Sequence, residues 1–168
     1  MVLEIIEQSL ILEGKKYSRK ELMSLSANAT GDNTSSFLLD LYRFLADWFS
    51  DSPFMTVHTS GSTGTPKVLT VRKEQMMQSA RMTCEFLNLH TGDTALLCMP
   101  LQYIAGKMMV VRALVAGLNL ILRTPSGHPL ADVTVPLRFV AMVPLQVFNT
   151  LQVLREKERL CHTDILII

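Results

Sequence analysis

The sequence predicts an α/β fold, in which a mostly parallel sheet is flanked by helices. Three observations carry this prediction. From residue 95 onward, short apolar segments typical of buried strands alternate with helical segments, and this order builds parallel sheets. The hydrophobic fraction of 48% and the charged fraction of 18% describe a globular chain with a substantial core. The length of 168 residues fits one domain.

The chain is expected to begin with two short strands and a helix. In residues 9–22 (SLILEGKKYSRKEL), two strand-like runs meet at a turn formed by Glu13 and Gly14. Ser18 and Glu21 then have the spacing of a capping box, which satisfies free N–H groups at a helix N-terminus. A helix is therefore predicted to start directly after the second strand.

The next segments predict two helices around a pair of strands. Residues 28–36 (NATGDNTSS) have the composition of a loop, and residues 37–49 place apolar side chains on one face of a helix. Residues 54–59 and 68–71 have the β-branched character of strands, and residues 73–90 again show helical spacing. The intervening glycine-rich and hydroxyl-rich loop therefore joins two strands.

The remaining elements build the parallel part of the sheet. Residues 95–99 and 118–122 are short apolar strands on either side of an apolar helix, residues 105–117, which a glycine closes. Residues 123–136 are loop-like. Three further segments follow. A strand is predicted at residues 139–143, one helix with a proline in its first turn at residues 144–160, and a final strand at residues 164–168.

Composition and charge restrict the class of protein. A formal net charge of +1 gives no reason to expect nucleic acid or an anionic membrane as a partner. Cys84, Cys98 and Cys161 lie far apart without CxxC spacing, which favours reduced thiols over disulfides or a zinc site. Glutamates interrupt the apolar start of the chain, unlike a signal peptide, and no apolar run has the length of a membrane span. We therefore expect a cytoplasmic protein with small-molecule partners.

The segment that carries chemistry is residues 58–67 (HTSGSTGTPK). It differs from a Walker A loop, because Pro66 precedes the lysine and Val68 stands where that loop has its metal-binding hydroxyl. Gly61 and Gly64 permit a close backbone approach, and Lys67 supplies a positive charge suited to polyphosphate. Composition alone favours a phosphate-binding loop no more than a plain hydrophilic hairpin turn.

The order of these residues separates the two interpretations. Residues 59–67 closely resemble the signature loop of the adenylate-forming enzymes, which include acyl-CoA and aryl-CoA synthetases, luciferase and the adenylation domains of peptide synthetases. Residues 17–22, 89–93 and 100–106 are similar to further segments of that family. Within it, residues 100–106 (PLQYIAG) and 141–147 (AMVPLQV) resemble the o-succinylbenzoate–CoA ligases of menaquinone biosynthesis.

The resemblance implies an activity, its cofactors and its phosphate ligands. Such enzymes join a carboxylic acid to AMP with ATP and Mg²⁺, release pyrophosphate, and pass the acyl group to the thiol of coenzyme A. Lys67 would stabilise the charge that develops on the departing pyrophosphate. By the same match, the residues that would bind the ATP phosphates are Thr59, Ser60, Gly61, Ser62, Thr63, Gly64 and Lys67.

Two residues of the next segment are candidates for the surroundings of the acyl substrate. Tyr103 stands where many members have a histidine, and tyrosine can donate a hydrogen bond but carries no positive charge near neutral pH. Lys107 could attract a substrate carboxylate. Ordinary packing at a helix start explains Tyr103 equally well, and a solvated helix edge is the simpler explanation for Lys107.

The family resemblance also predicts what residues 1–168 leave out. Its Gly-Gly-Ala adenine loop, the segment with its magnesium-linked glutamate, its ribose-binding aspartate, and the small C-terminal domain with the adenylation lysine are not in this sequence. Residues 1–168 are therefore expected to be a single partial domain, the N-terminal part of an AMP-binding domain. This part alone is expected to be inactive as a ligase and to associate into homo-oligomers through exposed apolar surface. The alternatives are another aryl-CoA or acyl-CoA synthetase and a non-catalytic binding module with the same fold.

Overall fold

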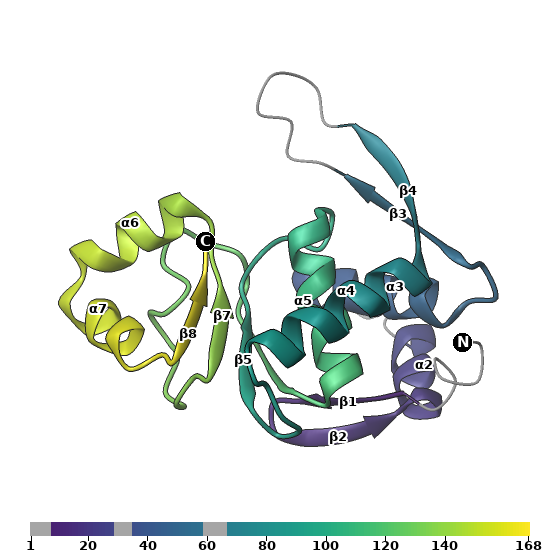
Figure 1. The fold of residues 1–168 in the computed structure, drawn as a ribbon, viewed down its shortest axis with the longest axis horizontal. Coiled ribbons are helices and arrows are strands. Elements are labelled where there is room, and N and C mark those ends of the chain that lie inside the picture. The colour runs from purple at the N-terminus through teal and green to yellow at the C-terminus, as the bar shows by residue number, and fades with distance from the viewer. Residues whose placement is uncertain (1–7, 29–34, 59–66) are drawn as a thin grey trace.

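The computed structural model of the chain describes residues 8–28, 35–58 and 67–168 (Figure 1). Its strands and helices, in chain order, are β1 Ser9–Leu12, β2 Lys15–Ser18, α2 Arg19–Asn28, α3 Ser36–Phe49, β3 Phe54–His58, β4 Val68–Arg72, α4 Lys73–Phe86, β5 Thr94–Leu97, α5 Ile104–Ala116, β6 Asn119–Leu122, β7 Phe139–Ala141, α6 Pro144–Gln152, α7 Leu154–Cys161 and β8 Ile165–Ile167.

The centre of the fold is a six-stranded sheet with the order β2-β1-β6-β5-β7-β8. Only β1 and β2 pair antiparallel, and every other neighbouring pair is parallel. Strands β3 and β4 form a separate antiparallel hairpin that projects from the body of the molecule (Figure 1). The predicted fold class, a mostly parallel sheet flanked by helices, is confirmed.

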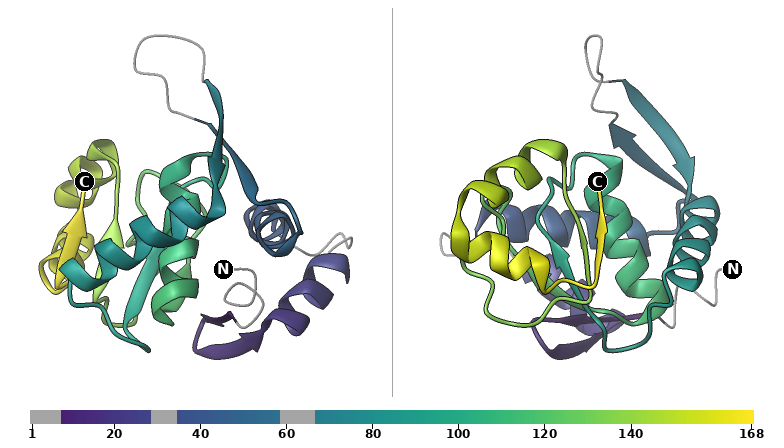
Figure 2. Two further views of the ribbon diagram at one scale, coloured as in Figure 1. Left: turned by 45° about the vertical axis from the view of Figure 1, so that its right-hand side comes forward. Right: turned by 60° about the vertical axis from the view of Figure 1, so that its left-hand side comes forward.

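Helices cover both faces of this sheet and create two apolar clusters. Along β5 the side chains alternate, so that Ala95 and Leu97 join the larger cluster with α3, α4 and α5. Leu96 and Cys98 point to the opposite face and join a smaller cluster, against which Val147 of α6 packs. Helices α6 and α7 therefore lie on the opposite side of the sheet from α3, α4 and α5 (Figure 2). Burial on both faces of the strand explains why Ala95, Leu96 and Leu97 of β5 are all apolar.

Local signals in the sequence set several element boundaries. The Ser18 N–H donates to the Glu21 carboxylate at 2.8 Å, which confirms the predicted capping box at the start of α2. Helix α5 ends at Gly117, whose φ of 70° lies in the left-handed region that favours glycine. A Cβ at this position would also come within 3.0 Å of the Thr91 hydroxyl.

One boundary differs from the prediction. Residues 144–160 are not one helix, because α6 ends at Gln152 and α7 begins at Leu154, with Val153 in an extended conformation (φ −112°, ψ 114°) between them. The break redirects α7, so that its Glu156 becomes buried and contacts His128. No helix within residues 8–28, 35–58 and 67–168 is both long and apolar enough to cross a bilayer.

Candidate functional site

The topology of the sheet marks one edge as the candidate site. The chain leaves β5 through α5 and returns on one side as β6, whereas it leaves β7 through α6 and α7 and returns on the other side as β8. These connections also run over opposite faces of the sheet (Figure 2). In open α/β sheets, ligands bind outside the carboxyl ends of the strands at such a switch point. The candidate site therefore lies at the carboxyl ends of β5 and β7.

The β3–β4 hairpin is attached to this same edge. The N–H of His58, the last residue of β3, donates to the Gln102 carbonyl at 3.3 Å, and His58 also forms an isolated parallel bridge with Tyr103. The segment that contains Gln102 and Tyr103 follows β5 directly. The open end of the hairpin is therefore held beside the carboxyl end of β5.

The predicted phosphate ligands divide between described residues and the segment outside them. Lys67 is exposed and immediately precedes β4, where Val68 pairs with His58 across the hairpin. This register places Lys67 at the open end of the hairpin. The predicted ligands that lie outside the described residues are Thr59, Ser60, Gly61, Ser62, Thr63 and Gly64.

Lys107 and Tyr103 both contribute to this attachment. Lys107 Nζ donates to the Thr56 carbonyl at 2.5 Å and so connects α5 to β3. Burial lowers the pKa of Lys107, while the negative charge of Asp47 raises it in part. Tyr103 is half-buried at the N-cap position, immediately before α5, in extended backbone conformation. That either residue lies near an acyl substrate stays a prediction.

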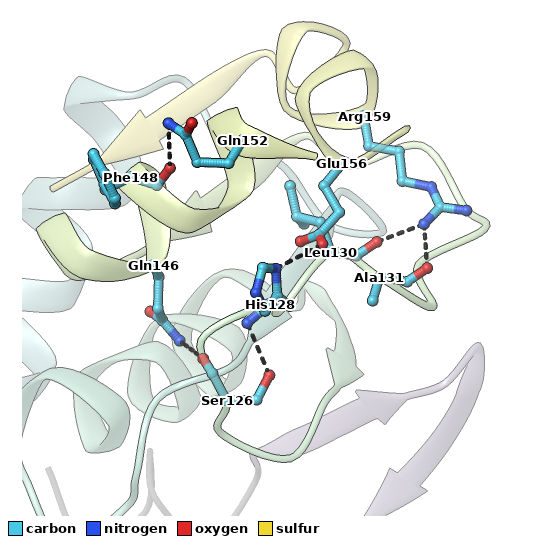
Figure 3. Close-up of polar contacts among 9 residues, drawn as sticks. All are labelled: Ser126, His128, Leu130, Ala131, Gln146, Phe148, Gln152, Glu156 and Arg159. Carbon is cyan, nitrogen blue, oxygen red and sulfur yellow. Dashed lines mark hydrogen bonds and ion pairs between the residues drawn. The ribbon is translucent and has the colours of Figure 1, made fainter. Parts of the chain in front are cut away.

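Gln146 is a residue of the candidate site that the sequence reasoning missed. Its Nε2 donates to the Ser126 carbonyl at 2.9 Å (Figure 3). The same Nε2 donates to the Cys98 carbonyl at 3.0 Å, and the Oε1 accepts from the Val143 N–H at 3.1 Å. Cys98, Ser126 and Val143 follow β5, β6 and β7 respectively. Gln146 is 6% exposed, so the buried amide connects the carboxyl ends of three neighbouring strands. A glutamine three residues after the N-cap residue Val143, in the first turn of a helix that begins with proline, is the signal that could have identified it.

A second polar cluster holds the loop between β6 and β7 against α7. His128 Nδ1 lies 2.9 Å from Glu156 Oε1, and Glu156 is only 3% exposed. Arg159 donates to the carbonyls of Leu130 and Ala131 in the same loop (Figure 3). Among the residues that the structure describes, no group of three or more histidine, cysteine, aspartate or glutamate side chains is placed to hold a metal ion. The contacts of this cluster fix a loop and do not form a metal centre.

Comparison with known proteins connects this fold with one enzyme family. Residues 4–158 match the AMP-binding enzyme family, and the chain therefore belongs to it. The solved structure of an acyl-CoA synthetase (AMP-forming)/AMP-acid ligase II-like protein from Dyadobacter fermentans is 33% identical and superposes with a TM-score of 0.73, over 86% of this chain and 42% of that one.

Two further relatives carry more specific names. The 2-succinylbenzoate–CoA ligase of Haemophilus influenzae is 29% identical over 118 residues, which cover 70% of this chain and 25% of the ligase. The o-succinylbenzoate CoA synthetase of Bacillus subtilis, in complex with its acyl-adenylate intermediate, is 22% identical and has a TM-score of 0.50, over 58% of this chain and 26% of that one. The chain spans about a quarter of the length of the Haemophilus ligase.

Proposed function

We propose that this chain is the N-terminal part of the AMP-binding domain of a cytoplasmic, AMP-forming carboxylate–CoA ligase. Membership of the AMP-binding enzyme family supports the class of reaction. The attachment of the β3–β4 hairpin to the carboxyl edge of the sheet, through His58 and Gln102, is the main support for placing the ATP site at this edge. The remaining parts of the active site are supplied by polypeptide outside residues 1–168.

The chemistry of the proposed site is electrostatic. The hydroxyl groups and backbone N–H groups of residues 59–64 bind the β-phosphate and γ-phosphate of ATP, and Lys67 stabilises the charge on pyrophosphate as it leaves. Mg²⁺ bound together with ATP would neutralise phosphate charge. Rigid support of the loop matters for this function, because a donor misplaced by about 1 Å costs on the order of 10²-fold in rate. Lys107 and the His58 N–H provide that support by connecting β3 to α5 and to Gln102.

We further propose that the acid is o-succinylbenzoate and that coenzyme A accepts the acyl group, which would place the enzyme in menaquinone biosynthesis. The similarity to the Haemophilus 2-succinylbenzoate–CoA ligase supports this choice. The similarity to the Dyadobacter acyl-CoA synthetase-like protein favours the broader alternative, in which a different aryl or acyl acid enters the same chemistry.

The test is ATP–pyrophosphate exchange by the ligase that contains this chain, measured with o-succinylbenzoate, benzoate and a medium-chain fatty acid. We expect o-succinylbenzoate to support the fastest exchange and Lys67→Ala to slow it by on the order of 10²-fold to 10³-fold. Exchange that is fastest with another acid would replace the substrate but keep the reaction. Exchange that Lys67→Ala leaves unchanged, or no exchange with any acid, would overturn the proposal.

A further inference from the structure

Lys73 combines two features that a lysine normally avoids. It is the first residue of α4, where the positive end of the helix dipole disfavours a cation. It is also only 2% exposed, and lysine is almost never fully buried unless its ammonium group is paired. Among the residues that the structure describes, Lys73 and Glu156 are the two buried residues with ionisable charged side chains. Specific partners must therefore offset the burial of the Lys73 ammonium group.

The partner of Lys73 is the C-terminal end of α3. Its Nζ donates to the Ser50 carbonyl at 2.9 Å and to the Ser50 hydroxyl at 3.3 Å, and Ser50 is the C-cap of α3. The last turn of α3 contains Asp47 and no basic side chain. Because a cation is stabilised at the negative end of a helix dipole, Lys73 supplies from α4 the positive charge that the end of α3 lacks. Burial lowers the pKa of Lys73, and the negative charges of Asp47 and Asp51 raise it in part.

The contact between Lys73 and Ser50 closes the base of the β3–β4 hairpin. Ser50 and Pro53 lie in the connection from α3 to β3, and Lys73 directly follows β4. The Lys73 N–H also donates to the Pro53 carbonyl at 2.9 Å, next to Phe54 and Arg72, which are paired at this end of the hairpin. A single residue therefore holds the chain that enters the hairpin to the chain that leaves it.

Strand β4 connects this base to Lys67. Lys67 immediately precedes β4 and Lys73 immediately follows it, so at about 3.3 Å per residue the two are on the order of 20 Å apart. Over this length, a tilt of about 3° at the base moves Lys67 by about 1 Å. A displacement of about 1 Å at a reacting group costs on the order of 10²-fold in rate. The orientation of the base therefore matters at the open end of the hairpin.

We propose that Lys73 is a positioning residue, which orients β4 so that Lys67 reaches the phosphates of ATP. The inference rests on the proposed function, because it requires that Lys67 binds phosphate. Lys107 and the His58 N–H hold β3 near the open end of the hairpin, whereas Lys73 joins both strands at the base. Lys73 acts through β4 and does not itself contact the reacting atoms.

The experiment is a double-mutant cycle in the ATP–pyrophosphate exchange assay, on the complete ligase that contains this chain and with the acid that supports the fastest exchange. Lys73→Met keeps a long side chain and removes the ammonium group. We expect it to slow exchange at saturating substrates about tenfold, which is less than the full cost of a 1 Å displacement because the contacts of Lys107 and His58 remain. In the Lys67→Ala variant the same change should slow exchange less than about twofold, because its effect passes through Lys67.

Two measurements on the same ligase separate positioning from a general loss of stability. The urea midpoint of Lys73→Met should stay close to that of the unaltered ligase, because a buried apolar side chain replaces a buried charge and water can bind at exposed Ser50. Hydrogen exchange followed by mass spectrometry should be about fivefold faster in peptides that cover β3 and β4. The matched control is Gln75→Met, because Gln75 is exposed on the same helix, and it should change neither the exchange rate nor the hairpin peptides.

The milder variant Ser50→Ala removes one of the two acceptors of Lys73 Nζ and should slow ATP–pyrophosphate exchange about threefold. It replaces Lys73→Met in the cycle if that variant does not fold. Equal slowing with and without Lys67→Ala, or no slowing at all, would overturn the positioning role of Lys73, while slowing by Lys67→Ala alone would still support the proposed function. Exchange that Lys67→Ala leaves unchanged would overturn both.

Discussion

Gln146 provides the sharpest test of how the carboxyl edge is held together. Gln146→Leu preserves most of the side-chain volume but removes three hydrogen bonds, which leaves the carbonyls of Cys98 and Ser126 and the N–H of Val143 without this partner. A buried polar group that loses its partner costs about 1–3 kcal/mol. Cys98 is fully buried and bears that cost, whereas Ser126 and Val143 are exposed residues where water can substitute. We therefore expect a loss of about 1–3 kcal/mol in the free energy of unfolding.

The assay is urea unfolding followed by circular dichroism, with the midpoint and slope fitted for each variant. The control is Gln152→Leu on the same helix, because Gln152 is exposed and its Nε2 makes only a 3.5 Å contact with the Phe148 carbonyl (Figure 3). Its effect is expected to stay within about 0.5 kcal/mol. Equal effects of the two variants, or a loss below about 1 kcal/mol for Gln146→Leu, would refute the role assigned to the buried amide.

Three further predictions concern buried or anchoring groups. Burial raises the pKa of the Cys98 thiol from 9.0 to about 12. The unfolded chain releases this proton at lower pH, so stability falls by about 1.4 kcal/mol per pH unit between these values. Unfolding at pH 7 and pH 10 should show a smaller loss in Cys98→Ala, and equal losses would contradict this cause. Lys107→Met should speed amide exchange in β3 about fivefold by removing the bond to Thr56, and unchanged exchange would exclude an anchoring role. His128→Ala should cost about 1.5–3 kcal/mol in urea unfolding because buried Glu156 loses its partner, and a neutral result would contradict this.

Local patterns were sufficient to predict most of the fold. The capping box of Ser18 and Glu21, the glycine at position 117 and the alternation of apolar strands with helices act over a few residues, and each is confirmed. The order of strands in the sheet depends on packing between distant segments, so the switch point between β5 and β7 could not be predicted from local patterns.

The candidate site was predictable only where a residue pattern was specific. The order of residues 59–67 indicated the family, which the match at residues 4–158 confirms. Gln146 and Glu156 are both buried because α6 and α7 turn them toward the loop after β6, and no local pattern in the sequence indicates this burial. Lys107 was considered as a substrate contact or a solvated residue, and its bond to the Thr56 carbonyl depends on a hairpin position that only the tertiary structure defines.

The most direct test of the central claim is a titration of the isotopically labelled chain with ATP, followed by amide chemical shifts. We expect changes at His58, Lys67 and Tyr103, and an affinity at least about tenfold weaker in Lys67→Ala, because one charge-assisted bond to phosphate is lost. A groove of about 700 Å³ between residues 133–137 and α7, with Arg155 and Arg159 in its lining, offers a competing location for an anion. Shifts confined to that groove, or an ATP affinity that Lys67→Ala does not change, would contradict the proposal that the hairpin loop binds the phosphates of ATP.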